Sequence, residues 1–354
     1  MATLSLPTAN GKTERYTTGE PIVFKRGTQP RFNRVAYAAA HVVANPLADV
    51  DPWLDTAIDW DKTIAFRHYL WDLGLGVAEA MDTAQRGGGL DWPAAKELIR
   101  RALAAAKSLP GVKIACGVGT DHLAPGANVK IDDIIRAYEE QVEAVEAMGG
   151  QIVLMASRAL AAVAKSPDDY AKVYGRILSQ VREPVMIHWL GEMFDPALAG
   201  YWGADDHMVA MESCLGIIQD HAAKVDGVKI SLLSTEKEIE MRRRLPDGVK
   251  MYTGDDFNYA ELIAGDEEGY SHALLGGSER GVEIGLGGVR QLAEHLAGRR
   301  IDDILGLTLG AVAPLAVDIK LQVGIHGLFL TKTPGFSGNS SLQLALPGRS
   351  GNPV

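Results

Sequence analysis

The stretch Val225-Asp226-Gly227-Val228-Lys229-Ile230-Ser231-Leu232-Leu233 is a short apolar run with a lysine at its centre. Its length and composition predict a buried strand. An unpaired ammonium is costly to bury, and desolvation depresses a lysine pKa by roughly 3–5 units. A neutral lysine amine attacks carbonyl compounds and forms a Schiff base. Two interpretations of Lys229 stay open: a reactive lysine inside the fold, or one whose ammonium reaches water past the strand edge.

Similar apolar runs recur along the chain and alternate with helical patterns. The predicted strands are 34–42, 76–81, 111–117, 151–155, 184–189, 227–231, 248–253 and 270–275, and the predicted helices are 59–73, 91–107, 131–148, 168–181, 206–224, 235–245 and 259–264. Nearly continuous apolar strands separated by helices are typical of a parallel sheet covered by helices. Eight such units predict an α/β fold, a (β/α)8 TIM barrel. An open doubly wound sheet is the alternative, but no Gly-x-Gly-x-x-Gly follows the first strand.

The two ends of the chain differ from this middle part. Residues 1–30 are polar with scattered apolar positions, which predicts an N-terminal arm with a hairpin around Thr18-Gly19-Glu20. Residues 31–276 hold the predicted barrel. Glycine-interrupted apolar stretches predict a partly helical C-terminal extension over residues 277–354, with helices over 291–299 and 301–319. The Gly- and Pro-rich end predicts a disordered tail.

Composition narrows the partners. The chain has 354 residues, a net charge of −10 and no basic stripe, which argues against a nucleic-acid partner. Cys116 and Cys214 are too few for a disulfide framework, and the apolar run around Cys116 predicts a core residue. The N-terminus lacks a signal-peptide pattern, and no uninterrupted apolar stretch approaches the length of a spanning helix. We therefore expect a cytoplasmic protein with no membrane partner.

A TIM barrel carries its active site at the carboxyl ends of its strands. Polar residues lie on or after several predicted strands. The main candidates are Glu79, Asp82, Thr83, His188, Lys229, Ser231, Asp255 and His272, and further ones are Asn33, His41, Thr120, Asp121, His122, Ser157, Arg158, Thr253, Asp256 and Ser271. Single members have structural explanations, since Asp255 can cap the next helix and His272 can be a core histidine. Several polar residues at one end of consecutive strands nevertheless indicate a shared substrate pocket.

Three segments resemble a known family. The first is Ala78–Gln85 with Leu90–Glu97, the second is Gly227-Val228-Lys229, and the third is Thr253-Gly254-Asp255-Asp256. They resemble the Gly-Thr-Thr-Gly-Glu turn with its following helix, the Schiff-base lysine on strand six and the Gly-Asp-Asp turn of the dihydrodipicolinate synthase / N-acetylneuraminate lyase superfamily. The resemblance covers about residues 31–276 and is strongest to a divergent dihydrodipicolinate-synthase-like branch. It implies a class I aldolase-type barrel.

The sequence also departs from that superfamily. His188 stands where the superfamily has a proton-relaying tyrosine on strand five, and Leu154–Arg158 contains no tyrosine where a second one is expected. Of the Gly-Thr-Thr-Gly-Glu turn only Asp82-Thr83 is retained, with Ala84 in place of the second threonine. We therefore do not expect synthase activity towards pyruvate and aspartate semialdehyde. A histidine titrating near neutral pH can replace the tyrosine as acid and base.

The resemblance implies a Schiff-base-forming lyase or aldolase that acts on a small 2-oxo acid or related carbonyl compound. In this hypothesis Lys229 and His188 are catalytic, Thr83 with backbone N–H groups holds a carboxylate, no cofactor is needed, and a homo-oligomer is expected. The remaining candidates are assigned to substrate binding: Glu79, Asp82, Ser231, Asp255 and His272.

Two other classes of function stay open. One is a metal-dependent barrel isomerase or lyase, with Glu79, Asp82, His188 and His272 as ligands. The other is a non-catalytic barrel that binds or senses a small acid, which the missing tyrosines favour.

Overall fold

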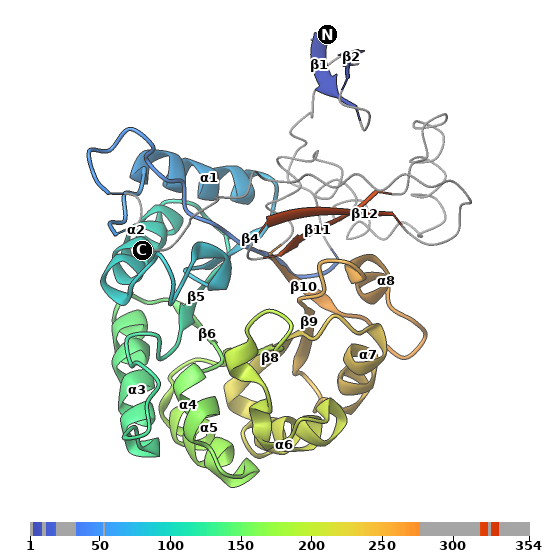
Figure 1. Cartoon of the computed structure of the whole chain (residues 1–354). Helices are drawn as coiled ribbons and strands as arrows, with labels where there is room; N and C mark the ends of the chain where they lie inside the picture. The colour runs from blue at the N-terminus through green and yellow to red at the C-terminus, as the bar shows by residue number, and fades with distance from the viewer. Residues whose placement is uncertain are drawn as a thin grey trace, which may run out of the picture. The chain divides into compact units, whose positions relative to one another are not determined.

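The structure is a computed structural model that describes residues 3–8, 12–18, 33–51, 54–276, 319–324 and 327–332. The chain divides into two units, residues 26–304 and residues 1–25 with 305–354. The larger unit contains a closed barrel whose neighbouring strands are all parallel, in the order β10-β3-β4-β5-β6-β7-β8-β9. Helices surround this barrel (Figure 1). The predicted (β/α)8 TIM barrel is confirmed, and the open sheet is excluded.

Each predicted barrel strand has a counterpart. The barrel strands are β3 (Ala36–Ala39), β4 (Gly76–Glu79), β5 (Ile114–Val118), β6 (Gln151–Leu154), β7 (Val185–Leu190), β8 (Val225–Ser231), β9 (Lys250–Thr253) and β10 (His272–Leu275). The helices are α1 (Trp60–Asp72), α2 (Trp92–Lys107), α3 (Ile131–Ala147), α4 (Arg158–Val163), α5 (Pro167–Gln180), α6 (His207–Asp220), α7 (Thr235–Arg244) and α8 (Tyr259–Ala264), with short 3₁₀ turns η1 (Asp82–Ala84), η2 (Pro196–Leu198), η3 (Tyr201–Gly203) and η4 (Ala222–Lys224). The predicted helices within the barrel are also present, and α4 is the one described α-helix that was not predicted.

Local sequence signals fix where the helices begin. Asp59 accepts a hydrogen bond from the backbone N–H of Lys62 at 3.0 Å and caps α1. Asp91 caps α2 in the same way through the N–H of Ala94, with Pro93 in the first turn. Within the described ranges, no helix has the length and hydrophobicity that a membrane crossing requires.

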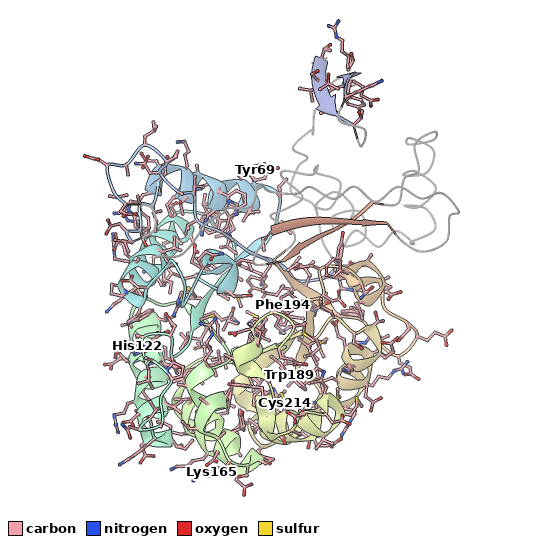
Figure 2. The ribbon with its side chains drawn as sticks, in the orientation of Figure 1. Tyr69, His122, Lys165, Trp189, Phe194 and Cys214 are labelled. Atoms are coloured by element: carbon pink, nitrogen blue, oxygen red, sulfur yellow. The ribbon has the colours of Figure 1, made fainter. Side chains whose placement is uncertain are left out.

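The strand side chains alternate between the barrel interior and the layer beneath the helices. Met186 and Tyr252 belong to the interior cluster, whereas Ile187 packs in the helix layer. Trp189 on β7 and Cys214 on α6, both labelled in Figure 2, are buried in that same layer. Cys116 is also buried there, and burial raises the pKa of its thiol well above the ordinary value. This fits the prediction that Cys116 is a core residue.

The smaller unit contributes two antiparallel hairpins. β1 (Thr3–Pro7) pairs with β2 (Thr13–Thr17), a hairpin that was not predicted. The hairpin predicted around Thr18-Gly19-Glu20 falls on Gly19 and Glu20, which lie outside the described residues. β11 (Ile319–Gly324) pairs with β12 (Gly327–Lys332), a hairpin that was not predicted. Residues 277–318 and 333–354, including the predicted helices and tail, lie outside the described residues except for Ile319.

A buried ion pair fastens β4 to α1. Arg67 donates through Nη2 to Oε1 of Glu79 at 2.7 Å and through Nε to Oε2 at 2.8 Å, and both side chains are 0% exposed. Arg67 also donates to the carbonyl oxygen of His41 at 2.5 Å. Glu79 points to the helix side, because Ala78 before it belongs to the interior cluster. The structure therefore does not place Glu79 in the predicted substrate pocket, since its carboxylate is bound to Arg67.

Replacing Arg67 with methionine should destabilise the fold strongly. The substitution leaves the Glu79 carboxylate buried without its counter-ion, which typically costs about 3–5 kcal/mol. Urea denaturation of Arg67→Met should show a loss of that order in the free energy of unfolding. The control is Arg176→Met, because Arg176 pairs with Glu139 while 57% exposed, and its loss should stay within about 1 kcal/mol. Equal losses in the two variants would contradict a structural role for the buried pair.

Candidate active site

Lys229 lies inside the barrel, near the carboxyl end of β8. It is aligned with His188 on β7 and with Tyr252 on β9, and strand alternation turns it to the interior side while Ile230 packs in the helix layer. Lys229 is 4% exposed. Within the described part of the chain, no hydrogen bond or ion pair holds its ammonium. A buried lysine of this kind is uncommon in a protein core.

Gly254 provides the space that the lysine side chain occupies. A Cβ at position 254 would lie 2.7 Å from Cε of Lys229 and 2.8 Å from the carbonyl oxygen of Ile230, and it would overlap Oγ of Ser231. Carbon atoms do not approach one another so closely, so only glycine fits this position without a shift of its neighbours. The glycine of the Thr253-Gly254-Asp255-Asp256 segment therefore has a direct physical link to Lys229.

His188 lies beside Lys229 on the neighbouring strand, about 4.8 Å away at the backbone. Its ring is 1% exposed, and Nε2 is 3.3 Å from Oγ of Ser231. Burial and the positive charge of Lys229 lower the pKa of His188 to about 3, although Asp82 acts in the opposite direction. His188 is therefore neutral at pH 7.

Asp82 and Thr83 open the 3₁₀ turn η1 that follows β4. Burial alone would raise the pKa of Asp82, but the charge of Lys229, with backbone N–H groups of the turn, lowers it. Asp82 is therefore an anion that faces the lysine. Oδ1 of Asp82 and Oγ1 of Thr83 are buried and have no hydrogen-bond partner among the described residues. Such atoms are rare in native proteins, and a bound ligand is one explanation for them.

The chain reaches η1 through a strained residue. Ala80 has φ = 53°, in the left-handed region that non-glycine residues seldom adopt. Strain of this kind costs about 1–3 kcal/mol and clusters at functional sites. Here it redirects the chain at the end of β4, just before Asp82 and Thr83.

A pocket of about 110 Å³ lies among the loops that follow β4, β5, β6 and β7, and Asp82 and His188 are part of its wall. Lys229 does not line this pocket itself but lies beside His188 on the neighbouring strand. Its wall combines polar and charged side chains with apolar ones. The lining residues are Asp82, Arg86, Gly87, Gly119, Thr120, Asp121, Leu123, Pro125, Met155, Ala156, Arg158, Ala159, His188, Leu190, Asp195 and Leu198. A small molecule in this pocket would contact His188, the strand neighbour of Lys229, and Asp82, whose negative charge interacts with Lys229.

The structure brings Lys229, His188, Ser231 and Asp82 together, and Thr83 follows Asp82 in η1. Two other predicted site residues lie elsewhere, as Glu79 does. Asp255 accepts hydrogen bonds from the N–H groups of Phe257 and Asn258 at 2.9 and 3.0 Å, so it caps the turn before α8. His272 is the first residue of β10, at the amino end of the barrel, and its Nδ1 accepts the N–H of Val35 at 2.9 Å. Neither side chain lines the pocket.

This placement also separates the four residues considered as metal ligands. Glu79 is bound to Arg67 on the helix side, and His272 lies at the opposite end of the barrel from Asp82 and His188. Among the residues that the structure describes, no group of three or more His, Cys, Asp or Glu side chains is arranged to hold a metal ion.

Arg86 is a site residue that the sequence did not reveal. Its guanidinium donates to the carbonyl oxygens of Ala80 and Gly117 at 3.0 Å, to both carboxylate oxygens of Asp121, and to Oε1 of Gln141 at 2.8 Å. It therefore ties the loop after β4 to β5 and α3. The available signal was an arginine before three glycines, Arg86-Gly87-Gly88-Gly89, in the loop after the second barrel strand.

Solved structures with a similar fold include an aldolase and two synthases. A variant of the 2-keto-3-deoxygluconate aldolase of Sulfolobus solfataricus is 16% identical with a TM-score of 0.53, over 78% of this chain and 77% of that one. Dihydrodipicolinate synthase from Cyanidioschyzon merolae with lysine bound is 17% identical with a TM-score of 0.52, over 78% and 84% of the two chains. The Aquifex aeolicus enzyme is 11% identical with a TM-score of 0.52, over 79% and 84%. The chain thus has the fold of the dihydrodipicolinate synthase / N-acetylneuraminate lyase superfamily, as the resemblance implied.

Sequence comparison assigns the chain to one protein family. No curated protein matches the sequence. One family model, described as "Protein of unknown function (DUF993)", matches residues 4–286, which include all eight barrel strands. The chain therefore belongs to the DUF993 family.

Proposed function

We propose that this protein is a Schiff-base-forming lyase or aldolase that acts through Lys229 on a small 2-oxo acid or related carbonyl compound. The observation that carries the proposal is the lysine itself, which is buried at the carboxyl end of a barrel strand without a partner among the described residues. Solved structures of an aldolase and of a synthase share the fold, which supports this class of chemistry.

The side chains around the lysine fit the steps of this chemistry. The Lys229 amine adds to the carbonyl carbon, and loss of water gives a protonated imine. That cation draws electrons from the neighbouring carbon, so a carbon–carbon bond can form or break there. Asp82, an anion close to Lys229, stabilises the cation. The hydroxyl of Thr83, which has no partner among the described residues, donates to the substrate carboxylate.

His188 carries the proton in this proposal. It is neutral in the resting protein because burial and the Lys229 charge depress its pKa. A carboxylate-bearing substrate brings negative charge next to the ring, which raises the pKa and makes proton uptake easier. Ser231, 3.3 Å from Nε2, keeps the ring oriented toward the interior. His188 thus takes the place of the tyrosine that the resemblance led us to expect.

The geometry disfavours one of the two alternative functions and is compatible with the other. A metal-dependent reaction is disfavoured because Glu79 and His272 lie away from Asp82 and His188. A barrel that binds a small acid without catalysis would use the same pocket, so only reactivity at Lys229 separates it from the enzyme. A cytoplasmic location and a homo-oligomer, both expected from the sequence, stay predictions.

Cyanoborohydride reduction in the presence of a panel of 2-oxo acids should attach at least one of them covalently to Lys229. Intact-mass and peptide analysis would detect the adduct and its position. Lys229→Met should abolish the adduct, because among the described residues no lysine lines the pocket and Lys229 lies next to His188, which does. Lys172→Met is the control, since Lys172 is an exposed partner of Asp132 and should keep full labelling.

Two results would contradict the proposed reaction. One is the lack of any adduct across the panel. The other is a thermal stabilisation by a small acid that survives Lys229→Met without an adduct in the unsubstituted protein, which would indicate a binding protein.

The pKa of His188 is open to direct measurement by NMR with labelled histidine. The ring should not titrate between pH 5 and 8, because its pKa lies at about 3. Lys229→Met should raise that pKa by removing a positive charge, while burial keeps it below the ordinary value. A His188 pKa near the ordinary value of about 6.5 would contradict the described surroundings of the ring.

Because the pKa of His188 is lowered in the folded protein, protonation of this histidine makes the free energy of unfolding depend on pH. The unfolded chain binds the proton near pH 6.5 and the folded chain only near pH 3. Between these values, stability falls as the pH falls, by at most about 1.4 kcal/mol per pH unit. Glu238 acts in the opposite direction, because burial raises its pKa to about 7. The test is therefore to measure the free energy of unfolding of His188→Gln and of the unsubstituted protein by urea denaturation at pH 7 and at pH 5. The decrease from pH 7 to pH 5 should be smaller in the variant.

A further inference from the structure

We propose that Arg158 binds a second carboxylate of the substrate, distant from the reacting carbonyl, and that the pocket therefore selects 2-oxo diacids. This inference rests on the proposed Schiff-base function. Arg158 is the first residue of α4, the helix that follows β6, and it lines the pocket.

Two arginines line the pocket, and they differ in the use of their donors. A guanidinium has five N–H donors. Arg86 uses all of them within the protein, on two carbonyl oxygens, both oxygens of Asp121 and Gln141. Its side chain is almost fully buried. Arg86 therefore holds the loops together and has no donor left for a ligand.

Arg158 uses only part of its donor set. Nε donates to Oδ2 of Asp195 at 2.5 Å and Nη1 to the carbonyl oxygen of Gly87 at 3.3 Å. The other N–H groups have no partner among the described residues, and the side chain is 46% exposed. Since Arg158 lines the same pocket as His188 and Asp82, these donors can meet a ligand that reaches Lys229.

The guanidinium is held in position from two sides. Asp195 is fixed by its own hydrogen bond from the N–H of Ala197 at 3.1 Å to Oδ1, which leaves Oδ2 for Arg158. Gly87 has φ = 67°, and a Cβ there would lie 3.2 Å from Nη1 of Arg158. The bare glycine backbone thus lets the guanidinium lie close against the loop after β4. A positioned arginine loses less conformational freedom when it binds an anion than a mobile one does.

The charges around the pocket favour a carboxylate over a phosphate. Three aspartates line it, Asp82, Asp121 and Asp195, and Arg86 neutralises only Asp121. A singly charged, planar group matches the fork of a guanidinium and suffers less repulsion from these aspartates than a doubly charged phosphate. In this proposal the far carboxylate stays at Arg158, and the carbonyl end of the substrate passes Asp82 and His188 to reach Lys229 beyond the pocket wall.

The test compares 2-oxo diacids of four, five and six carbons with the 2-oxo monoacids of the same lengths. The readout is the concentration that gives half-maximal trapping on Lys229. At least one diacid should be preferred by roughly ten- to hundredfold, the usual effect of a hydrogen-bonded charge pair. Arg158→Gln should remove that preference while leaving the trapping of monoacids in place, and Arg158→Lys should restore part of it. The control Arg176→Gln, in an exposed ion pair between α5 and α3, should keep the preference.

The inference is overturned if no diacid is preferred, or if the preference survives Arg158→Gln. The role of Arg158 can also be tested without Schiff-base formation. Calorimetric binding of the same diacids to Lys229→Met, which can form no adduct, should weaken by the same factor when Arg158→Gln is added. If the unsubstituted protein forms no adduct but Arg158→Gln still weakens the calorimetric binding, the Schiff-base reaction is wrong and the carboxylate site is supported. If there is no adduct and no weakening of binding, both the reaction and the carboxylate site are wrong.

Discussion

The site depends on one constraint, the placement of a lysine ammonium inside the barrel where water does not surround it. Lys229 is buried and has no hydrogen-bond or ion-pair partner among the described residues. A stable core ordinarily avoids such a group or pairs it. The neighbouring residues accommodate it: Gly254 gives it room, His188 stays neutral beside it, and Asp82 supplies an opposite charge. The proposed role of Lys229 as a nucleophile gives a reason for a feature that is unfavourable for stability alone.

The charged groups of the barrel divide into two kinds according to how they are paired. Arg67 with Glu79 and Arg86 with Asp121 use their hydrogen-bonding capacity within the protein, and they join the strands to each other and to the helices. Lys229 and Arg158 have N–H groups without a hydrogen-bond acceptor among the described residues, and Oδ1 of Asp82 accepts no hydrogen bond from them. The second kind gathers at the carboxyl ends of the strands, where a TIM barrel has its active site. The first kind fixes the geometry that the second kind uses.

The barrel could be predicted from the sequence because each strand is nearly continuous in apolar residues and each helix has its own period and cap. The site could be predicted only in part, because the sequence gives the order of residues along a strand and not the face or the end at which a side chain lies. Glu79 is one residue beyond Ala78 and thus on the opposite face, and His272 begins its strand. Asp255 follows its strand as expected but turns back to cap the next helix. The role of Arg158 depends on Asp195 and Gly87, residues far away in sequence that only the fold brings near it.

The most direct measurement of the central claim is a crystal structure of the protein after reduction with a trapped 2-oxo diacid. The account predicts continuous density from Nζ of Lys229 into the ligand, with His188 beside the new bond and the far carboxylate against the guanidinium of Arg158. Density for the ligand attached to a surface lysine, with Lys229 unmodified in the barrel, would contradict the assignment of Lys229 as the nucleophile.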